Sequence, residues 1–498
     1  TGGRSAIMYY GTDITLSSPT FSDAHKSRFI EFATGSIANL ENIEFKNCDE
    51  KDGNGNAIKV DSDTEQITLT ECTFTDCGTN GFAVQVEGST FTLEDCVFKF
   101  TNTENSCRAI EITTISKTTI TGCQFINTNN KDSNTVTGSF YYHPATEEVE
   151  ALTFVENSFD NCVGSIYKTF YIKSFKAPTF SHIVIENIGT DSAPSDYIGE
   201  LSISSAEEFT IQSCIFRHNP APSAHGGGSA IKISRTNAQS SALQLTFHSC
   251  LWENNHAVYN KNLNYGRYNG VGGAFQQGLH SDLSNVQLTF DNCSFLGNKA
   301  DREGGALAIQ TTKSVVVTNC LFEGNQGGLK PASQTGASLL TNPPTNSGCG
   351  GAIYIDSGFT GAATQNDQMK AFRITRTVFR KNKAVNGHAI YIRNGLTRSN
   401  ALELDFKVYD GTVFTDNGIG GCTILTEIDK FSVEPETVFN FTLKNESSRP
   451  FDFGPGTVAV YENLIFENVA AATTNDEGSV IHLMEGILEA RIINCQFI

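Results

Sequence analysis

The stretch 292–298 reads Asn-Cys-Ser-Phe-Leu-Gly-Asn and is followed at 304–307 by Gly-Gly-Ala-Leu. The same pair returns as Asn-Cys-Leu-Phe-Glu-Gly-Asn at 319–325 and as Gly-Gly-Ala-Ile at 350–353. Recurrence at intervals of a few tens of residues is typical of stacked repeat architectures, in which each unit packs only against its neighbours. The pattern therefore predicts a solenoid rather than a globular domain built around one core.

The aromatic position of this motif can be followed along the chain, and its shortest step is the 24 residues from Phe74 to Phe98. So short a unit excludes a propeller blade, and the repeat has no helical period. Ile185 and Phe439 are interpreted as filling two gaps, which predicts about fifteen coils. The remaining stations are Phe45, Phe125, Phe159, Phe216, Trp252, Phe295, Phe322, Phe379, Phe414, Phe466 and Phe497.

Each repeat carries alternating apolar residues. Positions 286–290 read Val-Gln-Leu-Thr-Phe, as in a half-buried strand, and Ala-Ile-Tyr-Ile at 352–355 indicates a second, short strand. Cys293 and Phe295 lie two residues apart, so both are expected to face the interior. Asn, Gly and Asp separate the strands. The sequence predicts an all-β, single-stranded right-handed parallel β-helix without significant helix, forming one continuous domain over 1–498.

Two other features concern the extent of this domain. Residues near 257–271, 326–347 and 357–370 lengthen single repeats and are expected to form loops, which in solenoids often lie on the binding face. The chain begins and stops within a repeat, so we expect it to be part of a longer protein.

The net charge of −19 argues against nucleic acid and anionic membranes as partners. Such a net charge is explained most simply by a solvated surface, and it would also fit a surface that binds cations.

The cysteines follow the repeat. Eight of the 14 precede the aromatic station by two residues, and stacking suits such a ladder better than disulfide geometry does, so buried thiols are expected. Cys48 and Cys77, at a turn on adjacent coils, are the pair expected to be oxidised. Cysteine usage alone leaves the cellular compartment open.

The alternation of Phe-x-x-Asn with Gly-Gly-Ala-Ile/Leu resembles the repeats of chlamydial polymorphic outer membrane proteins and of related surface proteins of protists such as trichomonads. It is clearest over about 210–420. The resemblance implies a secreted or surface-displayed β-helix used for adhesion.

Catalysis was weighed because many β-helices act on polysaccharides. A glycosidase needs two carboxylates beside the scissile bond, and the chain contains no Asp-Asp pair. Glu94 with Asp95, Asp160 and Asp291 occupy similar positions in the repeat, which either a carboxylate site or a solvated face would explain. No catalytic residue, cofactor or metal site is therefore predicted.

Several local motifs have simpler explanations than chemistry. The stretch 52–63 resembles a calcium loop but lacks the glycine and glutamate that such loops need, so a turn is preferred. His218 and His225 are interpreted as loop residues. Asn440 and Asn445 are possible N-glycosylation sites, whereas Asn292 is expected to begin a buried strand and remain unmodified.

These observations favour a non-catalytic, adhesin-like or structural protein, extracellular or at the cell surface. It would bind protein or glycan partners through its faces and loops. The alternatives are a carbohydrate-active β-helix enzyme, which requires carboxylates of adjacent coils to converge, and a subunit of an extracellular filament or cell coat.

Overall fold

A computed structural model describes residues 6–22, 28–48, 57–78, 81–88, 90–101, 108–113, 117–130, 137–144, 152–164, 168–174, 178–188, 199–203, 207–221, 231–234, 242–259, 270–277, 285–309, 312–329, 348–356, 369, 371–385, 387–393, 405–426, 437–444, 447–453, 458–462, 464–467, 469, 482–483 and 489–498.

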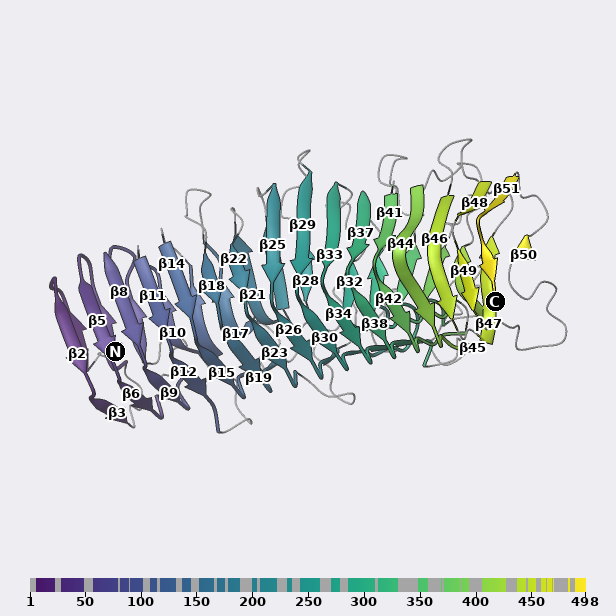
Figure 1. Ribbon diagram of the computed structural model, residues 1–498. Coiled ribbons are helices and arrows are strands. Elements are labelled where there is room, and N and C mark those ends of the chain that lie inside the picture. Colours follow the sequence, from purple (N-terminus) through teal and green to yellow (C-terminus); the bar gives the residue numbers. More distant parts are fainter. Residues whose placement is uncertain are drawn as a thin grey trace, which may run out of the picture. The chain divides into compact units, whose positions relative to one another are not determined.

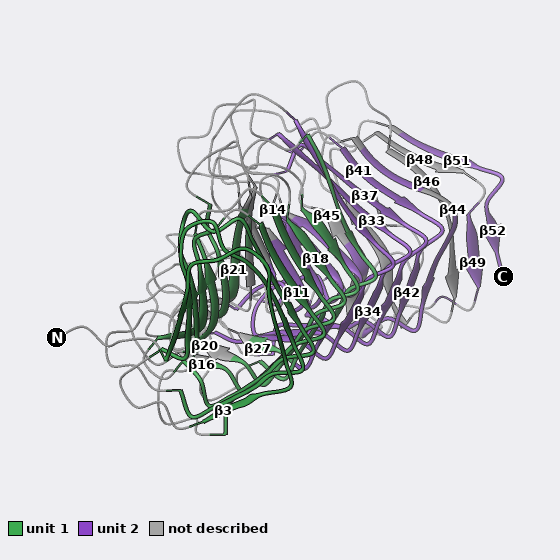
Figure 2. Ribbon diagram, turned by 90° about the vertical axis from the view of Figure 1, so that its left-hand side faces the viewer, with its two compact units in different colours: residues 1–215, 219–221, 233–237 green, residues 216–218, 222–232, 238–498 purple. Residues whose placement is uncertain are grey.

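The described residues form a right-handed parallel β-helix, as predicted (Figure 1). Every regular element among them is a β-strand. The chain divides into two compact units, which Figure 2 colours separately. Unit 1 comprises Thr1–Ile215, Asn219–Ala221 and Ile233–Asn237, and unit 2 comprises Phe216–His218, Pro222–Lys232 and Ala238–Ile498.

Each coil is built on three strands. Some coils carry a short fourth one, namely, in unit 1, β16 (Asn129–Asn130), which pairs with β20 (Val163–Gly164), and β27 (Pro220–Ala221), and, in unit 2, the ladder of β31 (His256–Ala257), β35 (Lys299–Ala300) and β39 (Gln326–Gly327). In unit 1, β8 (Gln66–Thr70) is followed by β9 (Thr73–Thr75) and then by β10 (Phe82–Val86). Glu71 and Asp76 form the two corners, each with a φ of 54°. The sequence indicated only two strands in a repeat, because the Cys-x-Phe segment is too short to show an alternation of its own. In the structure that segment is the middle strand.

Strands of successive coils pair in parallel and build three ladders in unit 1. The long-strand ladder contains β2 (Ile14–Ser17), β5 (Ile37–Glu41), β8, β11 (Thr90–Glu94), β14 (Lys117–Thr121), β18 (Thr153–Val155), β22 (Thr179–Ser181) and β25 (Glu208–Gln212). The short-strand ladder contains β3 (Thr20–Ser22), β6 (Glu44–Lys46), β9, β12 (Val97–Lys99), β15 (Gln124–Ile126), β19 (Ser158–Asp160) and β23 (Val184–Glu186). The Ala-Ile ladder contains β1 (Ile7–Tyr9), β4 (Ile30–Phe32), β7 (Ile58–Val60), β10, β13 (Arg108–Ile112), β17 (Thr137–Tyr142), β21 (Lys168–Ser174) and β24 (Gly199–Ile203).

Unit 2 repeats this plan. Its long strands are β29 (Leu243–His248), β33 (Val286–Asp291), β37 (Ser314–Thr318), β41 (Ala371–Thr375), β44 (Asp405–Thr415), β46 (Thr437–Lys444), β48 (Val458–Glu462) and β51 (Glu489–Ile493). Its short strands are β30 (Leu251–Glu253), β34 (Ser294–Leu296), β38 (Leu321–Glu323), β42 (Val378–Arg380), β49 (Ile465–Glu467) and β52 (Gln496–Phe497). Its third ladder contains β32 (Phe275–Gln277), β36 (Leu307–Ile309), β40 (Ile353–Asp356), β43 (Ile390–Arg393), β45 (Ile419–Thr426), β47 (Ser447–Phe453) and β50 (His482–Leu483).

The aromatic stations stack inside the coils. Phe74 and Phe98 have ring centroids 4.6 Å apart with planes within 2° of parallel. In unit 2 the corresponding values for Phe295 and Phe322 are 4.5 Å and 6°. Rings of successive coils stack because parallel pairing places equivalent residues about 4.8 Å apart. The core of each unit therefore contains a column of stacked rings, interrupted by Ile185 in unit 1 and by Leu443 in unit 2.

Of the two stations filled by inference, one is confirmed and one is wrong. Ile185 lies opposite Phe159 in the short-strand ladder. Phe439, however, pairs with Val408, and Leu443 lies opposite Phe414. The error arose because β46 runs without a corner, so the spacing between the two kinds of strand is not visible in the sequence.

The two asparagines of the motif have different roles. Asn292 is a corner residue with a φ of 54°, a left-handed conformation that Asn tolerates better than most residues. Asn298 is buried, and its Oδ1 accepts hydrogen bonds from the backbone N and the Nδ2 of Asn255, at 3.1 and 2.9 Å. Its Nδ2 donates to the Trp252 carbonyl and to Asn325 Oδ1, both at 3.0 Å. The same links continue through Asn382 and Asn417.

The free cysteines of the described ladder are buried, as expected, apart from Cys495, which is partly exposed. Cys96 is buried, and its thiol donates to the carbonyls of Leu69 and Glu94 at 3.6 and 3.3 Å. Burial raises the pKa of the Cys96 thiol well above its usual value, so the group stays protonated and unreactive. Cys48 and Cys77 form a disulfide between adjacent coils, with Cα atoms 4.3 Å apart.

Replacing Asn298 by Ala should lower the free energy of unfolding by about 2–6 kcal/mol. The change leaves a buried N–H of Asn255 and a buried carbonyl of Trp252 without partners, at about 1–3 kcal/mol each. Urea unfolding measures the loss. Asn292→Gly is the control, because glycine adopts the same φ and the side chain is exposed. Equal losses in both variants would contradict the role of the buried ladder.

Peptide mapping of unreduced protein should recover one cross-linked pair joining Cys48 to Cys77. Cys72 and Cys96 should react with an alkylating reagent only after unfolding, because both are buried thiols. Alkylation of Cys48 and Cys77 in native, unreduced protein would show that the disulfide does not form.

Candidate functional site

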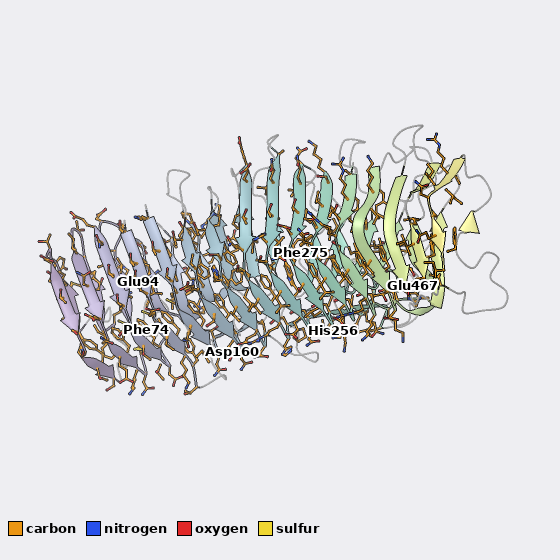
Figure 3. The ribbon with its side chains drawn as sticks, in the orientation of Figure 1. Phe74, Glu94, Asp160, His256, Phe275 and Glu467 are labelled. Atoms are coloured by element: carbon orange, nitrogen blue, oxygen red, sulfur yellow. A yellow bond between two sulfur atoms is a disulfide. The ribbon has the colours of Figure 1, made fainter. Side chains whose placement is uncertain are left out.

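The carboxylates singled out from the sequence do not converge. Glu94 ends β11 and lies opposite Thr121, and the next residue, Asp95, is a corner with a φ of 51°. Asp160 lies on the short-strand ladder, where its Oδ1 accepts a hydrogen bond of 2.9 Å from Asn187. Figure 3 labels Glu94 and Asp160 on their separate strands. These carboxylates therefore share a position in the repeat and lie on the surface, but they do not form one site.

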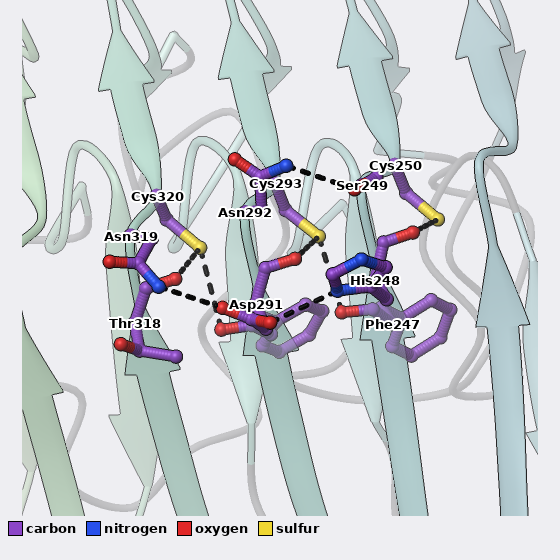
Figure 4. A network of polar contacts seen from close by, with 11 residues as sticks. Phe247, His248, Ser249, Cys250, Asp291, Asn292, Cys293, Thr318, Asn319 and Cys320 are labelled. Atoms are coloured by element: carbon purple, nitrogen blue, oxygen red, sulfur yellow. Dashed lines mark hydrogen bonds and ion pairs between the residues drawn. The ribbon is translucent and has the colours of Figure 1, made fainter.

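Asp291 belongs to a surface network of unit 2 (Figure 4). Its Oδ2 lies 3.0 Å from His248 Nδ1, and its Oδ1 accepts a hydrogen bond of 3.0 Å from Asn319 Nδ2. Asn292 Nδ2 donates to Ser249 Oγ at 2.9 Å. Because both carboxylate oxygens are already bonded, the network ties neighbouring coils together.

The expected position of Asn292 was wrong. The residue does not begin a buried strand but forms an exposed corner before Cys293. The sequence pattern concealed this because the asparagine directly precedes the inward-facing Cys293. Asn440 lies in β46, and Asn445 is outside the described residues.

Other predicted features fall largely outside the described residues. They include 52–56 of the calcium-like stretch, His225, and 260–269, 330–347 and 357–368 of the long insertions. His218 is a corner residue with a φ of 54°, and its Nε2 lies 3.4 Å from Asn254 Nδ2. Across the described ranges, no group of three or more His, Cys, Asp or Glu is placed to hold a metal. Nor does the described part contain a helix able to span a membrane.

The structure instead brings polar and aromatic residues together on the outside of the Ala-Ile ladder of unit 1. Strand pairing places Lys59 beside Gln85, Gln85 beside Glu111, Glu111 beside Tyr141, and Tyr141 beside Tyr171. The flanking residues of these strands, such as Val84, Val86, Ile110 and Ile112, are buried in the core. Because side chains of a strand alternate between its two faces, the five residues form one outward column.

Three rings at the end of this column form what we call the aromatic patch: Tyr141, His143 and Tyr171. Their centroids are 5.7 Å (Tyr141–His143), 5.5 Å (Tyr141–Tyr171) and 6.0 Å (His143–Tyr171) apart, with planes within 27° of one another. Three nearly parallel rings at nearly equal mutual distances cannot form one face-to-face column. The rings are offset from one another, an arrangement that aromatic pairs prefer. Part of each ring face therefore remains uncovered by the other two.

Glu111 adjoins the patch. Its Oε2 accepts a hydrogen bond of 3.0 Å from Gln85 Nε2. Burial raises the pKa of the Glu111 carboxyl, and Glu87 acts in the same direction; the Gln85 hydrogen bond and the charge of Arg108 oppose them. Burial, with Glu111 nearby, also raises the pKa of Tyr141. Glu111 is thus a half-buried carboxyl for which ionisation is disfavoured.

The pKa of His143 is shifted in the opposite direction. Burial lowers the pKa of its imidazole, and the positive charge of Lys173 lowers it further. The ring is therefore neutral near pH 7 and able to accept or donate one hydrogen bond at each nitrogen. The column and His143 together offer a carboxyl, an amide, two phenols and a neutral imidazole on one face.

The sequence contained a signal for this site that was not used. Ala57-Ile58-Lys59, Ala83-Val84-Gln85 and Ala109-Ile110-Glu111 are equivalent segments of successive repeats, so aligning their third residues would have revealed the column. The aromatic members were harder to find, because Ser139-Phe140-Tyr141 replaces the Ala-Ile pattern. The prediction relied on the Cys-x-Phe half of the repeat, whereas the site lies on the Ala-Ile half.

Replacing Glu111 by Gln should make stability less dependent on pH. A free Glu titrates near about 4.3, and the pKa of Glu111 is raised in the folded protein, so the native state keeps this proton to higher pH than the unfolded state. Stability due to Glu111 is therefore complete below the unfolded pKa and falls as pH rises through the folded one. The free energy of unfolding of Glu111→Gln minus that of wild type should increase between about pH 4 and about pH 7.

Denaturant titrations at a series of pH values measure this difference. Glu41→Gln, which alters an exposed carboxyl on β5, is the control. A difference for Glu111→Gln that decreases over the same interval would show that the carboxyl is stabilised in its ionised form.

Comparison with known proteins gives the fold without an activity. The profile of a family described as "Right handed beta helix region" matches residues 1–143. No curated protein sequence matches the chain. Among solved structures, the A-module of the mannuronan C-5 epimerase AlgE6 from Azotobacter vinelandii is similar at 9% identity and a TM-score of 0.24, with 92% of this chain and 90% of that chain covered.

Proposed function

We propose that the protein is an extracellular, adhesin-like β-helix that binds neutral glycans at the aromatic patch of unit 1. The observation that carries the proposal is the offset arrangement of Tyr141, His143 and Tyr171 on an outward face of the ladder. Ring faces bind the apolar faces of other groups, while phenol and imidazole edges supply hydrogen bonds. Sugars present both kinds of surface.

The negative charge of the protein favours neutral glycans over acidic ones. The protein carries a net charge of −19, Glu31 lies on the same ladder as Glu111, and Glu87 directly follows β10 of that ladder. Acidic polysaccharides would therefore be repelled. Glu111, held by its hydrogen bond from the buried Gln85, lies beside Tyr141, where it would receive a hydroxyl group of a neutral sugar.

Two features support an extracellular location. Disulfides such as Cys48–Cys77 persist in oxidising compartments and are rare in the cytosol. The repeats also resemble those of surface-displayed bacterial and protist proteins, which implies adhesion. Nothing in the described residues favours a filament subunit.

Tyr141→Ala and Tyr171→Ala should each weaken binding of neutral oligosaccharides about tenfold or more, equivalent to about 1.4 kcal/mol. Each change removes a ring from the patch, while the core residues Phe140 and Ile172 remain. Isothermal titration calorimetry with gluco-, manno-, xylo- and N-acetylglucosamine oligomers measures the affinity.

Tyr10→Ala is the matched control, because this tyrosine of unit 1 is 70% exposed and lies outside the patch. Its affinity should equal that of wild type. If none of these oligomers binds wild type, or if all three variants bind equally, the patch is not a glycan site.

A further inference from the structure

We propose that Asn292 is a site of N-linked glycosylation and carries a covalently attached oligosaccharide on the surface of unit 2. The inference rests on the extracellular location in the proposed function and is independent of the aromatic patch. Asn292-Cys293-Ser294 is a sequon for this modification, in which one residue other than proline separates Asn from Ser or Thr. The expectation that Asn292 remains unmodified rested on a buried position, whereas the residue is an exposed corner.

The backbone places both reacting positions of the sequon on the outside. Asn292 is exposed, and its φ of 54° makes it the corner between β33 and β34. The next side chain, Cys293, is buried in the coil. Phe295 also packs in the core, so Ser294 before it faces outward, because side chains alternate along a strand. A bulky, polar oligosaccharide at Asn292 would therefore extend into solvent and leave the core unchanged.

The hydrogen bond made by Asn292 is compatible with the modification (Figure 4). Its Nδ2 donates to Ser249 Oγ at 2.9 Å, which links the corner to the preceding coil. An Asn side chain has two N–H donors, and glycosylation replaces the hydrogen of one of them. The second N–H can keep the bond to Ser249. Attachment of the sugar therefore costs the fold none of its described contacts.

The sequon is specific to this corner among the described ones. Nine described asparagines have a positive φ, and only Asn292 is followed two residues later by Ser or Thr. Asn319 is the equivalent exposed corner of the next coil, with Cys320 after it, but Leu321 stands opposite Ser294 in the ladder. The chain thus contains a second corner of the same geometry that lacks only the hydroxyl residue of the sequon.

The modification is a glycosyl transfer from a lipid-linked oligosaccharide pyrophosphate, the class of donor that oligosaccharyltransferases use. A bond forms between Asn292 Nδ2 and the anomeric carbon of the first sugar. The bond from that carbon to the phosphate oxygen of the donor breaks, and the lipid pyrophosphate leaves with the electron pair. Nδ2 loses one proton in the same step, and nothing is oxidised or reduced.

The test is peptide mapping of the full chain secreted from eukaryotic cells. Peptide N-glycosidase in ¹⁸O-labelled water removes the oligosaccharide and converts the modified Asn into an Asp that carries ¹⁸O, which mass spectrometry locates. Wild type should carry the label at position 292. Ser294→Ala should lose this label completely, although Asn292 and its partner Ser249 remain. Leu321→Ser completes a sequon at the matched corner and should gain a label at Asn319.

Each outcome decides the inference. Secreted wild type without label at position 292 overturns it, whether or not Asn440 or Asn445 is labelled. Label that persists in Ser294→Ala also overturns it, because spontaneous deamidation would then be its source. Failure of Leu321→Ser to gain a label at Asn319 would show that the corner geometry does not permit attachment. Thermal melting confirms that the variants fold.

The result is separable from the proposed glycan binding. An unmodified Asn292 leaves the aromatic patch untouched, since the patch belongs to unit 1 and is tested by calorimetry. Conversely, loss of oligosaccharide binding by the patch does not alter the label expected at position 292.

Discussion

Parallel pairing of each coil with the next is the interaction on which the other features depend. It repeats every position at the spacing of two strands, so any side chain meets its own equivalent. Apolar positions become columns of rings, such as Phe74 on Phe98. Polar positions become hydrogen-bonded chains, such as Asn298 between Asn255 and Asn325. The corners that close each coil require left-handed conformations, which explains the recurrent Asn and Asp.

The same constraint creates the candidate site. A single outward residue on a β-strand has little binding capacity, but a register that aligns Gln85, Glu111 and Tyr141 makes a continuous surface. Neighbouring groups then change one another. Burial raises the pKa of Glu111, with Glu87 adding to it, and burial lowers the pKa of His143, with Lys173 adding to it. Chemistry in a solenoid thus arises from the order of substitutions along a column rather than from a pocket enclosed by one motif.

Much of the fold could be predicted from the sequence because the inward positions obey the repeat. The β-helix, the buried thiols, the Ile185 station and the Cys48–Cys77 pair all follow from residues whose spacing is nearly constant. Prediction failed where spacing changes, as at Phe439, where β46 passes through without a corner. It also failed at Asn292, because sequence does not show whether the residue before a buried cysteine begins the strand or forms the corner.

The site was harder to predict, because outward residues vary freely and only pairing reveals which of them meet. The most direct test is a crystal structure of the protein with a bound neutral hexasaccharide. The account predicts sugar rings on Tyr141, His143 and Tyr171, with a sugar hydroxyl group within hydrogen-bond distance of Glu111. A hexasaccharide bound on another ladder, or only in unit 2, would contradict it.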